Sequence, residues 1–221
     1  MPPSVGGPGV DGLVRLVREA QSKPVVRSTV EERIREFGAV NASPPEKWFE
    51  ELAYCLLTAY SSARMGAVCV SALVEGDALV HGDVEGVRGC LRAQGHRFAN
   101  KRAEYIVEAR ELAPTLKATL TGMRTSQQRR RWLVENIKGL GMKEASHFLR
   151  NVGYLDLAIV DRHIISNMLE LGIITERPKS VTPRRYLEYE ALLGAAARVL
   201  GMPLGEMDLY LWYRKTGVVA K

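Results

Sequence analysis

Apolar residues recur along most of this chain every three or four positions, the spacing of one face of a helix. No run of alternating apolar and polar residues is long enough to predict a strand. The pattern therefore predicts an all-α protein of about ten helices. The predicted helices cover residues 30–37, 43–60, 63–74, 84–93, 98–113, 126–137, 142–152, 162–171, 182–200 and 204–213.

Some of the predicted helix ends carry recognisable signals. Ser43-Pro44-Pro45-Glu46 combines a serine cap, proline in the first turn and a glutamate three residues after the serine, as in a capping box. Thr125 or Ser126 can cap another helix, and Pro114 should stop the helix that precedes it. Residues 1–12 lack the basic and apolar segments of a signal peptide, and we expect them to form a disordered tail.

Glycines suggest where the chain divides into two helical subdomains. Candidate boundaries are the loop at residues 38–42 and the break at Gly153. We expect residues 43–153 to form one helical bundle. Residues 1–42 should pack with a C-terminal subdomain, residues 154–221. A catalytic cleft between the two would have Lys143 on one wall and Asp161 on the other.

Charge and composition narrow the class of protein. The 221 residues carry a net charge of +6 and are 46% hydrophobic. This mild basic excess fits a polyanionic partner, and it equally fits an ordinary solvated surface. Basic residues cluster at Arg97, Lys101 and Arg102 and again at residues 129–131. No apolar run approaches the roughly 20 residues that span a bilayer, so we expect a cytoplasmic, nucleoid-associated protein with no membrane partner.

The three cysteines do not have the spacing of a metal site. Cys55, Cys69 and Cys90 include no CxxC pair, and an iron–sulfur cluster held by thiolates needs four cysteines. Cys55 and Cys69 have apolar neighbours, and we interpret them as core residues in a reducing compartment. We therefore expect neither a metal nor another cofactor.

A short hairpin, Lys138-Gly139-Leu140-Gly141, lies between two predicted helices. Its glycines permit backbone angles that other residues adopt only at a cost. The N–H groups that begin the next helix, together with the helix dipole, would bind a phosphate. We count Lys138, Gly139, Gly141 and His147 as candidate contacts to the DNA backbone, without sequence preference. The alternative is a plain corner between two helices.

Lys143 and Asp161 are the candidate catalytic residues. Lys143 lies in the first helical turn after the hairpin, where the positive end of the dipole favours the neutral amine needed for nucleophilic attack. Asp161 closes the apolar run 157–160. It looks like a helix cap, and a carboxylate held by backbone N–H groups can also stabilise a cationic sugar. His147 and His163 could each donate to phosphate or be satisfied by neighbouring groups.

The segment from Asp208 to Tyr213 is rich in aromatic residues. Aromatic rings usually belong to a core, and they also form the pockets that hold a base flipped out of DNA.

Together these motifs resemble a known family. The run from Ile137 to Lys143, followed by Asp161, resembles the helix-hairpin-helix/Gly-Pro-Asp superfamily of DNA glycosylases. With GHRFANKRAEYIVEAR upstream and DLYLWYRKTG near the C-terminus, the chain is similar to the archaeal-type 8-oxoguanine DNA glycosylase/lyases from residue 30 onward. The hairpin differs from the superfamily pattern in having Leu140 between the glycines.

The resemblance implies a bifunctional enzyme of base excision repair. It would excise 8-oxoguanine from double-stranded DNA and nick the strand by β-elimination through a Schiff base on Lys143, with Asp161 as the catalytic carboxylate. Phe98 and Trp212 would flank the extruded base, and Asp208 and Lys221 would belong to the same pocket. We expect a monomer. The alternatives are a glycosylase for another damaged base, a non-catalytic hairpin DNA-binding protein, and an all-α interaction protein that binds no DNA.

Overall fold

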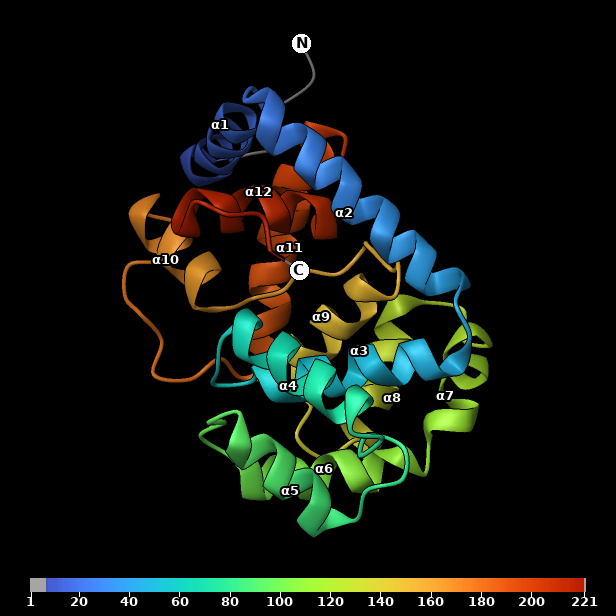
Figure 1. Ribbon diagram of the computed structural model, residues 1–221. Coiled ribbons are helices and arrows are strands. Elements are labelled where there is room, and N and C mark those ends of the chain that lie inside the picture. Colours follow the sequence, from blue (N-terminus) through green and yellow to red (C-terminus); the bar gives the residue numbers. More distant parts are fainter. Residues whose placement is uncertain (1–6, 221) are drawn as a thin grey trace. The chain divides into compact units, whose positions relative to one another are not determined.

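A computed structural model of the chain describes residues 7–220, and in this range all regular structure is α-helical (Figure 1). The all-α prediction is confirmed, with twelve helices in this range instead of about ten. They are α1 (Pro8–Gln21), α2 (Pro24–Ala42), α3 (Pro45–Thr58), α4 (Ala63–Glu75), α5 (Val84–Ala93), α6 (Ala99–Arg110), α7 (Ala113–Thr121), α8 (Ser126–Asn136), α9 (Met142–Asn151), α10 (Arg162–Glu170), α11 (Pro183–Leu200) and α12 (Leu204–Thr216).

The chain forms two compact units. The first unit is Met1–Phe37 with Gly153–Lys221, and the second unit is Gly38–Val152. Helix α2 begins in the first unit and ends in the second. None of the helices in residues 7–220 has the length and apolar character needed to cross a membrane.

Helix α3 is the centre of the second unit. It packs against α4, α6, α7 and α9, and its residues 51–57 are all buried. Trp48 is fully buried, its ring contacts Phe148 of α9 edge to face, and its indole N–H donates to the Val40 carbonyl at 3.0 Å. Because residues 51–57 are buried on every side, neighbouring helices must cover this half of α3, and one of them is α9, the helix of Lys143.

In the first unit, α1 packs against α11 and α12, and α10 packs against α12 (Figure 1). The expectation of a disordered tail through residue 12 is wrong for residues 8–12, which begin α1. Pro8 suits the first helical turn. Val10, Leu13, Val14 and Val17 then form a buried stripe, and burial of that stripe stabilises the helix.

Three other expected boundaries are also wrong. Helix α2 continues through Gly38 to Ala42. The cap of α3 is Pro44, whereas the Ser43 hydroxyl donates to the Ala39 carbonyl at 2.8 Å. Helix α6 ends at Arg110, and Pro114 lies in the first turn of α7, a helix that the sequence analysis missed. In contrast, Thr125 caps α8 in a capping box with Gln128.

Much of the positive charge in the two basic clusters lies inside the protein. Arg129 donates to the carbonyl of Leu120 at 2.8 Å, and Arg130 donates to the Ser146 hydroxyl at 3.2 Å. Arg102 donates to the Ala59 carbonyl at 3.1 Å. All three side chains are buried. These arginines therefore satisfy internal acceptors and are not part of a surface patch for nucleic acid.

The cysteines behave as the sequence predicts. Cys55 and Cys69 are fully buried, and burial, with Cys90 as a second cause, raises the pKa of the Cys69 thiol to about 11. Within residues 7–220 no group of three His, Cys, Asp or Glu side chains is placed to hold a metal ion.

An ion-pair network joins α10 to α12. Glu170 pairs with Lys215 and, at 2.9 Å, with Arg214, which also donates to Asn167 at 2.9 Å. Hydrogen bonds from Lys215 and then Arg214 lower the pKa of Glu170 from 4.5 to about 2. Because Asp161 begins α10 and Trp212 lies on α12, this network helps to fix two of the candidate site residues.

We predict that Glu170→Gln lowers the stability of the folded protein by less than about 1 kcal/mol, as for exposed ion pairs. The folded-state pKa is depressed, so the ion pairs contribute fully above pH 4.5, and the contribution is lost as the pH falls toward about 2. Urea unfolding of the wild type and of Glu170→Gln, measured from above pH 4.5 down toward pH 2, tests this prediction. Glu188→Gln is the control, and a pH-independent difference for Glu170→Gln would contradict the assignment.

Candidate active site

The hairpin between α8 and α9 contains one glycine whose backbone only glycine adopts easily. Gly139 has φ of +88°, in the left-handed region. Gly141 has φ of −94° and ψ of −174°, an extended conformation open to any residue. The expectation that both glycines need unusual backbone angles is therefore correct for Gly139 and wrong for Gly141. Leu140, between them, is buried.

Space also requires glycine at position 139. A Cβ there would lie 2.4 Å from the Tyr105 ring and 3.2 Å from a guanidinium nitrogen of Arg102. Both residues belong to α6. The hairpin backbone thus lies directly on α6, and any side chain at position 139 would push it away.

The start of α9 has the groups that bind an anion. Gly141 is its cap residue and has no side chain to accept from the first N–H groups. Uncapped N–H groups and the helix dipole together favour a phosphate at this position. Lys138, in the same hairpin, is exposed and pairs with Glu108 at 2.8 Å.

Lys143 lies in this first turn, with its side chain about one-third exposed. Its Nζ is 3.0 Å from Oε1 of Glu144, whose side chain is only 15% exposed. The sequence analysis missed Glu144. The available signal was its position three residues after the cap residue, from which a glutamate often reaches back to the helix start. His147, one turn later, is half-buried with its ring edge to face against Tyr54.

Asp161 is the cap of α10 in the first unit. Its Oδ1 accepts from the backbone N–H of His163 at 2.8 Å and of Ile164 at 2.9 Å. The residues before it, 157–160, are buried. The Tyr186 hydroxyl of α11 donates to the Ala158 carbonyl at 2.7 Å and accepts from the Val160 N–H at 3.1 Å. The carboxylate is therefore held rigidly from both sides.

Trp212, the other candidate residue of the first unit, lies against His163. Their ring centroids are 4.6 Å apart at an interplanar angle of 68°. The indole N–H of Trp212 is buried and has no hydrogen-bond partner among residues 7–220. Asp208, one turn earlier on α12, is buried. Lys221 lies outside the described residues.

Phe98 belongs to the second unit, at the start of α6. It lines a hollow of about 410 Å³ together with His96, Arg97 and Lys101. Its ring meets Tyr60 edge to face at 6.4 Å, and the Arg97 guanidinium lies 5.1 Å from the ring centroid. Tyr60 is 87% exposed with φ of +60°. The sequence analysis did not find this exposed aromatic residue, because nothing in the local pattern marks it.

The structure thus places the candidates in two sets. Lys138, Gly139, Gly141, Lys143 and His147 share the hairpin and α9 of the second unit, where Phe98 also lies. Asp161, Asp208 and Trp212 belong to the first unit.

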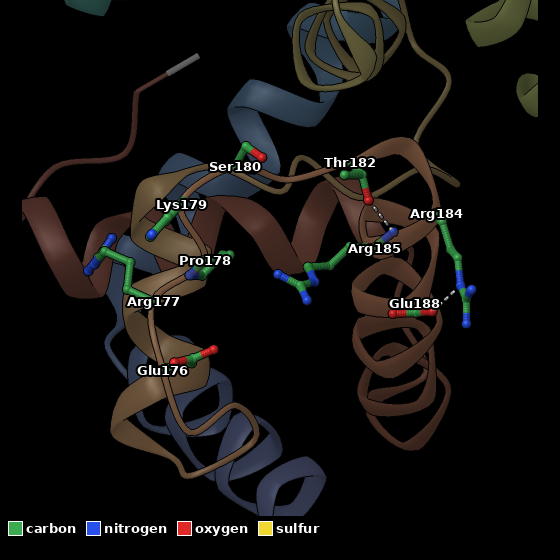
Figure 2. Close-up of a pocket in the computed structure, with 9 residues that line it drawn as sticks. All are labelled: Glu176, Arg177, Pro178, Lys179, Ser180, Thr182, Arg184, Arg185 and Glu188. Carbon is green, nitrogen blue, oxygen red and sulfur yellow. Dashed lines mark hydrogen bonds and ion pairs between the residues drawn. The ribbon is translucent and has the colours of Figure 1, made fainter.

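A larger hollow of about 550 Å³ lies in the first unit, between the loop after α10 and the start of α11 (Figure 2). Arg184 pairs there with Glu188 at 3.0 Å, and the Thr182 side chain caps α11 by accepting from the Arg185 N–H. None of the predicted site residues lines this hollow.

We predict that Gly139→Ala destabilises the protein by about 1–3 kcal/mol, the cost of left-handed backbone for a residue with a side chain, and weakens binding to duplex DNA. Urea unfolding and fluorescence anisotropy test this. Gly89→Ala is the matched control, since a Cβ at that position of α5 meets nothing within 4 Å and alanine favours a helix. Equal stability of the two variants would contradict the prediction.

Comparisons with known proteins identify the family. Residues 30–202 match the family model described as 8-oxoguanine DNA glycosylase. An 8-oxoguanine DNA glycosylase/AP lyase from Korarchaeum cryptofilum is 45% identical over 213 residues, which cover 96% of this chain and all of that protein. A protein of the same name from Methanocaldococcus jannaschii is 40% identical over 209 residues, which cover 95% of this chain and 99% of that protein.

Solved structures give the same result. The crystal structure of the Methanocaldococcus jannaschii 8-oxoguanine glycosylase/lyase with 15mer DNA containing 8-oxoguanine matches with a TM-score of 0.89 and 40% identity, covering 95% of this chain and 99% of that one. The 8-oxoguanine DNA glycosylase of Thermotoga maritima matches with a TM-score of 0.87 and 40% identity, covering 96% and 100%. The chain belongs to the 8-oxoguanine DNA glycosylase family.

Proposed function

We propose that Lys143 and Asp161 carry out the reactions of this family member, an 8-oxoguanine DNA glycosylase/AP lyase. The protein excises 8-oxoguanine from DNA and cleaves the strand at the resulting site, as its 40–45% identical relatives are named to do. The observation that carries the residue assignment is the one-third exposed side chain of Lys143 in the first turn after an uncapped glycine hairpin.

DNA binding begins at the hairpin. The N–H groups at the start of α9 bind a backbone phosphate, and Lys138 adds positive charge next to them. These contacts read no base edge, so they position the protein without sequence preference. The damaged nucleotide is then flipped out of the duplex, and the aromatic rings of Phe98 and Trp212 stack on its base.

Base release creates positive charge on the deoxyribose. Oδ1 of Asp161 is occupied by two backbone N–H groups, which leaves Oδ2 to face that charge. As the C1′–N9 bond breaks, its electron pair leaves with the base, which takes up a proton. A carboxylate fixed before the reaction stabilises the cationic sugar without reorganisation cost.

Lys143 then forms the covalent intermediate. Its neutral amine attacks C1′ and loses a proton, and opening of the sugar ring at O4′ gives a Schiff base between Nζ and C1′. Loss of a proton from C2′ expels the 3′ phosphate by β-elimination, which nicks the strand. This route joins base excision and strand cleavage in one reaction sequence.

We further propose that the protein acts as a monomer on nucleoid DNA in the cytoplasm, where its substrate lies. Light scattering of the free protein and of its complex with a single-lesion duplex tests the stoichiometry.

We predict that Lys143→Gln abolishes the covalent complex that borohydride traps with 8-oxoguanine duplex, because glutamine cannot form a Schiff base. DNA affinity should stay within about threefold. Lys47→Gln is the control, since this exposed lysine pairs with Glu50 at the start of α3, and its trapping should be normal. Trapping by Lys143→Gln at the wild-type level would refute the nucleophile.

Asp161→Asn should keep the fold, since asparagine caps helices as well as aspartate. Single-turnover base release should slow by about 10²-fold or more, the typical loss when one preorganised electrostatic group is removed. Gel analysis of the released strand measures the rate, and thermal melting checks the fold. An unchanged rate would reduce Asp161 to a helix cap.

A further inference from the structure

Glu144 contacts the amine assigned as the nucleophile. Its Oε1 lies 3.0 Å from Nζ of Lys143, and its side chain is the more buried of the two. The other oxygen, Oε2, lies 3.2 Å from where a Cβ on Gly141 would be. The carboxylate thus lies beside Gly141, and the missing side chain of this glycine leaves the room that the carboxylate occupies.

Arg102 also interacts with this carboxylate. Its buried guanidinium attracts Glu144 electrostatically and lies against the hairpin at Gly139. Since Arg102 is itself held by the Ala59 carbonyl, Glu144 interacts with two cations, a fixed guanidinium and the lysine ammonium. These two interactions restrict the rotation of the Glu144 side chain away from Lys143.

An ammonium group has no lone pair and cannot attack carbon, so Lys143 must lose a proton before it reacts. We infer that Glu144 accepts this proton and is the general base that activates Lys143. The inference rests on the proposed function, because it needs Lys143 as the nucleophile. Contact with a reacting atom, Nζ, makes Glu144 a catalytic residue.

The proton and electron balance is simple. One proton moves from Nζ to the Glu144 carboxylate, which leaves a neutral amine and a carboxylic acid. After the C1′–N9 electron pair has left with the base, the freed lone pair of Nζ forms the bond to C1′ of the cationic sugar. The proton on Glu144 is then available to the departing base or to O4′ on ring opening, and either step restores the carboxylate.

Other titratable groups near this pair come from three helices and a loop of the second unit. Arg102 and Tyr105 lie on α6, and Tyr60 in the loop after α3 interacts with Arg102. His147 lies one turn along α9 and contacts Tyr54 of α3. Glu144 pairs directly with Lys143 at 3.0 Å, so a change at position 144 should dominate the pH dependence.

The test is the pH profile of single-turnover cleavage of an 8-oxoguanine duplex between pH 5.5 and 9.5, with Glu144→Gln in the full chain. We expect the rate near pH 7 to fall by about 10²-fold, within the range for loss of a general base. The rate should approach that of the wild type as rising pH deprotonates the amine, and DNA affinity should stay within about threefold.

Glu85→Gln is the matched control, because Glu85 also lies in the first turn of a helix and pairs with a cation, Arg88. Its profile should match the wild type. A wild-type profile for Glu144→Gln would overturn the inference, and so would a slower rate that is equally slow at every pH, which is the mark of a structural role.

If Glu144→Gln fails to fold, the same pH profile is measured with Glu144→Asp, which keeps the negative charge at the start of the helix. We expect slower cleavage than wild type at pH 7 and convergence at high pH, and identical profiles would overturn the inference. Failure of the proposed function is distinguishable, because the wild type itself would then form no complex trapped by borohydride.

A different observation supports a second site. The hollow in Figure 2 is lined by four cations, Arg177, Lys179, Arg184 and Arg185, and by two carboxylates, Glu176 and Glu188. Glu188 already pairs with Arg184. Arg177, Lys179 and Arg185 have no carboxylate within 4 Å among residues 7–220, and all three are exposed.

We propose that this hollow binds a backbone phosphate of the DNA, in addition to the phosphate bound at the hairpin. Unpaired cations in one concavity are the charge pattern that a polyanion neutralises. The start of α11 adds the positive end of its dipole at the same place. Because only the backbone is bound, the site would serve any sequence and would apply equally to undamaged DNA. It rests on the proposed function for the identity of the polyanion.

The triple variant Arg177→Gln, Lys179→Gln, Arg185→Gln tests this second site. We expect the slope of log K against log salt for an undamaged duplex to become shallower by about 0.9 for each phosphate that the variant no longer neutralises. Borohydride trapping at saturating lesion duplex should persist, which separates this test from failure of the proposed function. The control, Arg15→Gln, Arg18→Gln, Arg35→Gln, removes the same charge. An unchanged slope, or an equal change in the control, would overturn the proposal.

Discussion

The left-handed backbone at Gly139, pressed against α6, is the constraint on which the candidate active site depends. This turn determines where α8 ends and α9 begins. A side chain at position 139 would collide with the Tyr105 ring, so the chain can reverse direction here only with glycine. The start of α9 then presents uncapped N–H groups, and Lys143 follows in the first turn. One turn thus positions both the proposed phosphate site and the proposed nucleophile.

Asp161 shows how one set of hydrogen bonds serves two purposes. The N–H groups of His163 and Ile164 begin α10 by donating to Oδ1. The same bonds fix the rotamer of the carboxylate, and no side-chain hydrogen bond reaches its other oxygen from residues 7–220. Tyr186 fixes the buried strand-like segment that precedes it. The hydrogen bonds that stabilise α10 thus also orient the carboxylate for its proposed role in base release.

The sequence predicted what depends on local pattern. Helix periodicity predicted the all-α fold, and cap signals placed Thr125 and Asp161 at helix starts. Proline was read as a helix end at Pro114, although it lies in the first turn of α7, because both positions tolerate the missing N–H. The buried arginines and Glu144 were missed because their partners, such as Ser146 or Lys143 Nζ, are set by side-chain orientation and packing, which periodicity does not encode.

The two buried cysteines have a consequence for an enzyme whose substrate is itself a product of oxidation. Sulfur is oxidised through the thiolate and where oxidants can reach it. Cys55 and Cys69 are fully buried, and the pKa of Cys69 is raised to about 11. Cys69 therefore has neither the thiolate form nor the exposure that oxidation needs. Reactive oxygen that damages guanine in the genome leaves this thiol intact. The core of the repair protein can therefore stay intact under the oxidative conditions that produce damaged guanine.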